Sequence, residues 1–183
     1  GLFIFLDTSP YLPQYYHDID QGWGVARDGY YGTEDGVRAV NDQDRQDQLS
    51  WLVSLLQRRG VHGSESQAHY VVVTGHHPMW VSSANEERTV SPFTNDFHPI
   101  LVQHQVHAYL SGHDHTMQHH QMDGIDYFVA GAGSKIGGTA EPIVGSRFSL
   151  ARQGFLLARM SPTYLDIQFV DYAGAPHQHF LLC

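Results

Sequence analysis

The chain contains 183 residues, a length that fits one domain and allows a hydrophobic core. Ten lysines and arginines stand against 19 aspartates and glutamates, which gives a formal net charge of −9. This balance argues against binding to nucleic acid or to an anionic membrane surface. No apolar run approaches the ~18 residues that a membrane-spanning helix needs, so no membrane span is expected.

Histidine is the unusual feature of the composition. There are 14 histidines, more than the ten lysines and arginines together, and half of them lie between residues 98 and 120. Neutral imidazole is a preferred ligand of zinc, iron and similar metals, so this clustering indicates imidazole chemistry. The single cysteine, Cys183, excludes an intrachain disulfide and a thiolate metal site.

The first half of the chain predicts a strand, a helix and a second strand. The apolar run 2–6 predicts a buried strand, and the β-branched run 69–74 predicts the next one. Between them lie a long loop over 10–40, to which no role is assigned, and a predicted helix over 41–59. The apolar positions of this helix repeat at helical spacing: Leu49, Leu52, Val53 and Leu56.

The second half repeats this order once and then changes. A helix is predicted over 95–105 and a strand over 106–110, after which short runs joined by turn residues predict antiparallel hairpins. The hairpin strands are expected at 116–122, 125–130, 154–160, 163–170 and 177–182. The expected fold class is therefore α/β, with a βαβαβ unit followed by antiparallel hairpins in one domain over 1–183.

Two histidine motifs follow predicted strands. His76 comes directly after the strand at 69–74, and His113 and His115 follow the strand at 106–110. Ligands of open α/β sheets gather beyond the carboxyl ends of the strands. In an extended segment, residues two apart point to the same side. We therefore expect His76, His113 and His115 to converge on a metal ion.

These motifs resemble those of the purple acid phosphatases, especially the small tartrate-resistant type, within the calcineurin-like metallophosphoesterase superfamily. A Gly-His-x-Pro followed by a Gly-His-x-His is a fairly specific pair, and the order and context of the motifs match. The matching segments are 5–8, 48–52, 74–80, 109–115 and 131–134.

The resemblance implies an α/β/β/α sandwich of which this chain is the carboxyl-terminal half. The family's GDxG, GDxxY and GNH segments do not occur in this sequence, so an absent amino-terminal half is expected to supply the remaining metal ligands. By the same resemblance, His76 and His113 bind a divalent metal and His115 binds the ferric ion of a binuclear centre, Fe(III) with Fe(II), Zn or Mn. The implied activity is metal-dependent acid phosphatase hydrolysis of small phosphomonoesters by in-line attack.

The sequence departs from the family in the loop at 82–88, which contains no histidine where the family has one that binds substrate. Asn85 is the candidate phosphate contact in that loop, and an ordinary solvated loop is the alternative. We do not expect His77 or Asp114 to bind metal. His77 either supports the site or is purely structural, and Asp114 is either an acceptor that supports the site or an ordinary loop residue. The small residues at 131–134 predict close backbone packing beside it. The resemblance implies secreted, lysosomal or vacuolar placement.

Two other functions remain open from the sequence. The first is a catalytically degenerate phosphatase-like domain that acts as a structural or interaction subunit. The second is a single three-histidine zinc site with an open water position. Because the runs 2–6 and 70–73 are apolar on both faces, we also expect one face of each strand to lie open in a half-domain.

Overall fold

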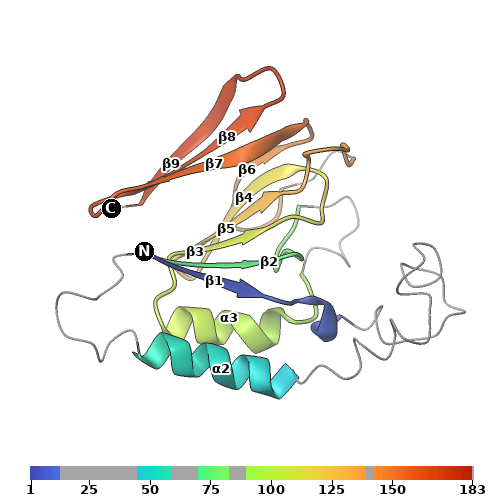
Figure 1. Cartoon of the computed structure of the whole chain (residues 1–183). Helices are drawn as coiled ribbons and strands as arrows, with labels where there is room; N and C mark the ends of the chain where they lie inside the picture. The colour runs from blue at the N-terminus through green and yellow to red at the C-terminus, as the bar shows by residue number, and fades with distance from the viewer. Residues whose placement is uncertain (13–44, 59–69, 83–89, 139–141, 183) are drawn as a thin grey trace, which may run out of the picture.

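The computed structural model describes residues 1–12, 45–58, 70–82, 90–138 and 142–182 (Figure 1). The helices are α2 (Arg45–Arg58) and α3 (Thr94–Gln103), with a short 3₁₀ helix η1 (Ser9–Tyr11). The strands are β1 (Leu2–Leu6), β2 (Val71–Gly75), β3 (Ala108–Ser111), β4 (Met117–Met122), β5 (Ile125–Ala130), β6 (Ser146–Leu150), β7 (Gly154–Met160), β8 (Leu165–Asp171) and β9 (Pro176–Leu182). The loop at 10–40 and the start of the first helix fall largely outside the described residues.

Six strands form one sheet in the order β1-β2-β3-β5-β4-β6. Strands β1, β2, β3 and β5 run parallel, and β4 and β6 are each antiparallel to their neighbours. The predicted α/β class and the change from βαβαβ to hairpins are confirmed. Strand β6 was not predicted, because its residues are mostly half-buried and show no apolar alternation.

The six-stranded sheet lies between two other layers (Figure 1). Helices α2 and α3 cover one face, and the core there includes Leu52, Val73 and Phe97. The three-stranded sheet β7-β8-β9 covers the other face, where Val72 and Phe128 lie in a second core. The described residues thus form three layers, helices and two sheets, of the expected α/β/β/α sandwich. No helix in these described residues is long and apolar enough to cross a membrane.

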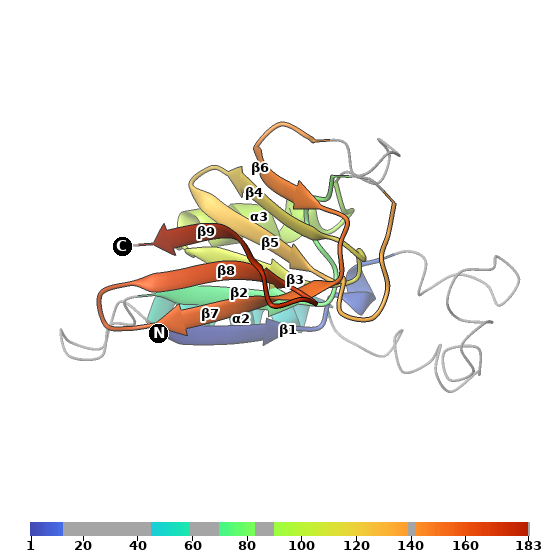
Figure 2. The same cartoon turned by 90° about the horizontal axis from the view of Figure 1, so that it is seen from above.

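The two apolar strands differ in how they are covered. All three valines of β2, Val71 to Val73, are buried, because this strand has a layer on each face. In β1, Ile4 and Leu6 are buried toward the helices, whereas Phe3 is 45% and Phe5 is 74% exposed. The expected open face is therefore present on β1, at the edge of the sheet (Figure 2), and the same expectation is wrong for β2.

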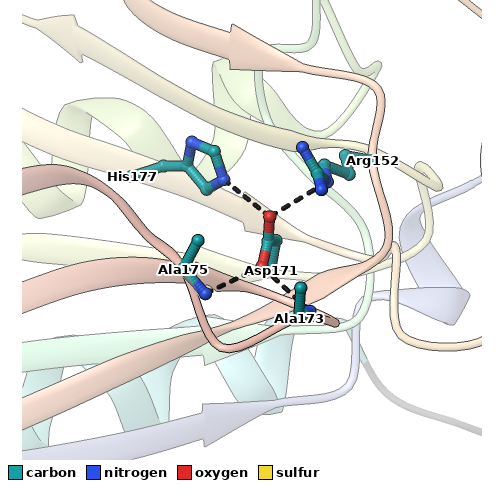
Figure 3. A network of polar contacts seen from close by, with 5 residues as sticks. All are labelled: Arg152, Asp171, Ala173, Ala175 and His177. Carbon is teal, nitrogen blue, oxygen red and sulfur yellow. Dashed lines mark hydrogen bonds and ion pairs between the residues drawn. The ribbon is translucent and has the colours of Figure 1, made fainter.

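A buried aspartate holds the turn between β8 and β9. Asp171 Oδ1 accepts hydrogen bonds from the backbone N–H groups of Ala173 and Ala175, both at 2.9 Å. Its Oδ2 lies 3.0 Å from His177 Nε2 and 3.0 Å from Arg152 Nε (Figure 3). The hydrogen bond from His177, more than the other contacts, holds the pKa of Asp171 below its usual range.

Replacing Asp171 with Asn is expected to lower the thermal midpoint of unfolding at pH 7, because the amide cannot serve all four donors. A carboxyl whose pKa is depressed in the folded state contributes stability above its unfolded pKa of about 3.9, and that contribution is lost as the pH falls. The difference between the two proteins should therefore shrink between pH 5 and pH 3 in circular-dichroism melts. Asp123→Asn, in an exposed pair with His98, is the control and should change little. Equal midpoints for Asp171→Asn and the unchanged protein at pH 7 would contradict this role.

Candidate metal centre

The site forms where three neighbouring parallel strands end. Strand β2 pairs with β1 on one side and with β3 on the other, so the carboxyl ends of all three lie at the same edge of the sheet. Thr8 follows β1, His76 and His77 follow β2, and His113 follows β3. This edge is where α/β sheets place their ligands.

Three imidazoles meet at this edge. Nε2 of His76 and Nδ1 of His113 are 3.2 Å apart, and the ring of His77 lies 4.5 Å from that of His113 between centroids. One ring nitrogen from each of the three residues lies within 4.8 Å of the others. His76 and His113 are exposed and His77 is buried, so the group opens to solvent on one side.

The geometry fits a metal ion. Two nitrogens bound to one tetrahedral zinc at about 2.0–2.1 Å each would be about 3.3 Å apart. The observed distance between His76 Nε2 and His113 Nδ1 is 3.2 Å. A set of imidazoles suits zinc, iron and similar divalent cations. The residues present therefore fit the kind of ion that the family resemblance implies.

Three polar contacts, two with Thr8 and one with Tyr109, fix the position of His77. Its Nδ1 lies 2.7 Å from Thr8 Oγ1, and its backbone N–H donates to the same oxygen at 3.2 Å. The Tyr109 hydroxyl donates to its carbonyl at 2.9 Å. Burial, followed by the neighbouring His113 and His76, lowers the pKa of His77 to about 3. The ring is therefore neutral at pH 7, the state in which imidazole binds metal.

His76 shows a smaller effect of the same kind. Desolvation lowers its pKa, and the nearby Asp7 carboxylate opposes that shift. The carbonyl of His76 accepts a hydrogen bond from the Gly112 N–H at 3.0 Å. This contact fixes the loop after β2 against the loop after β3.

His115 lies outside the three-histidine group. The expectation that His113 and His115 share a side assumed extended backbone, but His113 has φ of 62°, in the left-handed region. The chain bends at His113, so the two-residue spacing between His113 and His115 no longer places their rings on the same side. His115 is half-buried, and its carbonyl accepts the Gly137 N–H at 2.7 Å.

A buried network of hydrogen bonds centres on Gln118, the second residue of β4. The Gln118 amide donates to Thr116 Oγ1 at 2.6 Å and to the Ser82 carbonyl at 3.1 Å, and its oxygen is 2.8 Å from His120 Nε2. Burial lowers the pKa of His120 to about 4, which favours the neutral ring. The network therefore joins the loop after β2 to the loop after β3 without a charged group at His120.

The remaining predicted residues are placed as follows. His119 and His120 are neighbours on β4 with different contacts: His119 stacks on Phe128 at 4.5 Å between ring centroids, and His120 Nδ1 lies 3.0 Å from Ser146 Oγ. Burial raises the pKa of Asp114, which lies on the bend. A Cβ at Gly131 would collide with the Asp114 carbonyl oxygen, so close backbone packing occurs there. Asn85 lies outside the described residues.

Sequence reasoning missed two members of this arrangement. His77 belongs to the three-histidine group, although a supporting role was expected for it. Thr8, which contacts it, was given no role. The position of Thr8 shortly after the predicted strand at 2–6 could have indicated its role, because it puts Thr8 at the same sheet edge as the histidine motifs.

The α/β fold of this chain is shared with parts of two larger proteins of known structure. The structure aligns with GAP50, described as the anchor in the inner membrane complex of Plasmodium, at a TM-score of 0.71 and 20% identity, over 98% of this chain and 48% of that one. It also aligns with purple acid phosphatase PPD1 from yellow lupin (Lupinus luteus) seeds at a TM-score of 0.60 and 13% identity, over 76% of this chain and 28% of that one.

In sequence, the chain resembles the purple acid phosphatases, as its motifs predict. It is 29% identical to purple acid phosphatase 17 of Arabidopsis thaliana over 93% of this chain and 47% of that protein. It is 32% identical to tartrate-resistant acid phosphatase type 5 of Mus musculus over 69% of this chain and 39% of that protein. The chain thus spans less than half the length of these relatives, and no protein-family model matches it.

Proposed function

We propose that this chain is the carboxyl-terminal half of a metal-dependent acid phosphatase that hydrolyses small phosphomonoesters at a binuclear metal centre. The observation that carries the proposal is the 3.2 Å between Nε2 of His76 and Nδ1 of His113, at the strand ends where the motifs lie. The similarity to purple acid phosphatases supports the same chemistry.

In this proposal, His76 and His113 hold the divalent ion, Fe(II), Zn or Mn, and His115 contributes to the ferric site. An amino-terminal half supplies the other ligands. When bound, the two metals supply Lewis acidity and activate water for attack on phosphorus. Asn85 is the proposed contact to the phosphate. A secreted, lysosomal or vacuolar location goes with this assignment.

Other residues of this chain hold His76 and His113 in position. The Gly112 N–H bonded to the His76 carbonyl keeps the two metal-binding loops together, and the left-handed turn at His113 aims its ring at His76. Because His76 and His113 are exposed, a small phosphomonoester has direct access to this edge of the sheet.

The test compares the phosphatase activity and the colour of the 183-residue chain with those of a longer protein that contains the same chain. The 183-residue chain alone is expected neither to hydrolyse p-nitrophenyl phosphate nor to develop a purple colour, because the tyrosinate that colours the family lies in the absent half. A longer protein that includes the segment preceding residue 1 should do both after loading with iron. Turnover by the short chain at the rate of the longer protein would contradict the half-domain proposal.

The second candidate is a structural or interaction subunit with a phosphatase-like fold. The loop at 82–88 favours it, because it has no histidine where the family has one that binds substrate. The exposed Phe3 and Phe5 on the edge strand β1 fit both candidates, since either an amino-terminal half or a partner would cover them. GAP50, described as an anchor, has a similar fold. A longer protein that binds its metals fully but leaves p-nitrophenyl phosphate intact would favour this candidate.

A further inference from the structure

We propose that Lys135 binds a negative charge on the leaving group of the substrate, so that this site prefers phosphomonoesters whose leaving group carries a carboxylate or a further phosphate. This recognition rests on the proposed function for the phosphatase activity itself and adds the class of substrate to it.

Lys135 lies on the loop that follows β5, at the same edge of the sheet as the histidine motifs. Strand β5 pairs in parallel with β3, so the loop after β5 leaves the sheet at the edge where His113 follows β3. His76 follows β2, the next parallel strand, at this edge too. The loop over 131–138 therefore lies on the side of the sheet where the substrate would bind.

Two hydrogen bonds hold this loop against the bend after β3. The Gly131 N–H donates to the Thr116 carbonyl at 3.2 Å, and the Gly137 N–H donates to the His115 carbonyl at 2.7 Å. Lys135 lies between these two anchor points in the sequence. The loop thus cannot leave the bend without breaking backbone contacts at both of its ends.

The ammonium group of Lys135 is available to an external anion. Its side chain is exposed, and within the described parts of the chain it has no hydrogen bond or ion pair. In contrast, Arg152 and Arg159 are paired with the carboxylates of Asp171 and Asp166. A positive charge without a carboxylate partner can attract a substrate anion at full strength.

The charge of the whole chain makes this cation matter. Lys135 is the only lysine of a sequence with a formal net charge of −9, which repels anionic substrates. A cation at the edge offsets that repulsion most for the substrate with the most negative charge. Lysine is a compact charge on a flexible stem, so it suits anions at varied positions rather than one fixed geometry.

The test uses the longer, metal-loaded protein and two substrates of similar shape, 4-carboxyphenyl phosphate and its uncharged analogue 4-carbamoylphenyl phosphate. The ratio of their kcat/KM values reports the preference for a charged leaving group. Lys135→Gln should lower this ratio by about 5-fold, the upper range for one exposed ion pair, and Lys135→Arg, which keeps the charge, should retain it. The loss should appear in KM of the carboxylate substrate, because the contact is already made before the reaction.

The matched control is Arg147→Gln, which removes the same charge from β6. Arg147 donates to Gln121, near the end of β4 that lies away from the bend, so this variant should keep the ratio. Added salt should lower the ratio of the unchanged protein and hardly alter that of Lys135→Gln, since salt screens exposed charges. An unchanged ratio in Lys135→Gln, or an equal fall in Arg147→Gln, would overturn the inference.

Acetylation of Lys135 gives a second reading that needs no turnover. Its rate is measured by mass spectrometry of the peptide that contains Lys135, in the presence of a non-hydrolysable substrate analogue. The analogue 4-carboxybenzylphosphonate should slow the acetylation more than 4-carbamoylbenzylphosphonate does. Equal rates with the two analogues would also overturn the inference.

The two proposals fail in different ways. If the longer protein hydrolyses both substrates and Lys135→Gln keeps the ratio, the proposed function stands and the role of Lys135 falls. If it hydrolyses neither substrate but the carboxylate analogue still protects Lys135, the phosphatase function falls and the recognition of the anion stands.

Discussion

Replacing His113 with Asn in the longer, metal-loaded protein is expected to lower kcat for p-nitrophenyl phosphate by about 10³-fold. Lewis-acid stabilisation of the transition state is worth several kcal/mol, and a loss of about 4 kcal/mol corresponds to that factor. Asn is chosen because it tolerates a left-handed backbone, and His113 has φ of 62°. The variant therefore removes an imidazole while keeping the turn.

Steady-state kinetics and metal content should be measured on the same samples. His179→Asn, an exposed residue of β9 on the second sheet, is the matched control and should retain full activity and metal content. Circular-dichroism melts check that both variants keep the fold. Full activity in His113→Asn with normal metal content would remove His113 from the mechanism.

The largest effect on stability is expected from Phe128→Ala. Phe128 is fully buried between the two sheets, where it stacks on His119 and lies 5.4 Å from Phe180 and 6.2 Å from Phe169 between ring centroids. Truncating a buried Phe removes its burial and leaves a cavity, which costs about 3–5 kcal/mol. Urea unfolding of the 183-residue chain should show this decrease.

The matched control is Phe5→Ala on β1, where the side chain is 74% exposed. In the 183-residue chain this change should alter the free energy of unfolding by less than about 0.5 kcal/mol, as for surface substitutions. A larger loss for Phe5→Ala than for Phe128→Ala would show that the open face of β1 is covered within the chain. A loss for Phe5→Ala that appears only in the longer protein would place an interface on that face.

The element order could be predicted because its signals are local. The apolar repeat in α2 and the β-branched run of β2 each lie within a few residues, and two cycles of strand and helix force a parallel sheet. Parallel neighbours bring their carboxyl ends to one edge, so the meeting of His76 and His113 also followed from the sequence. Strand β6 could not be found this way, because pairing with β4, rather than its own apolar pattern, makes it a strand.

The place of His77 in the histidine group could not be predicted, because it depends on contacts between distant parts of the chain. Thr8 and His77 are 69 residues apart, and only the pairing of β1 with β2 brings them together. Likewise, His98 finds its partners Tyr127 and Asp123 through the packing of α3 against the sheet.

The sequence by itself determined the class of fold, the two histidine motifs and their common edge, because strand and helix periodicities follow from local side-chain patterns. The tertiary structure decided which imidazoles share that edge. The positive φ of His113 sets the course of the chain before His115, and the Thr8 hydroxyl holds His77 beside His76. Backbone dihedrals at a bend and contacts across a sheet depend on how the whole chain packs, so residue spacing alone does not determine them.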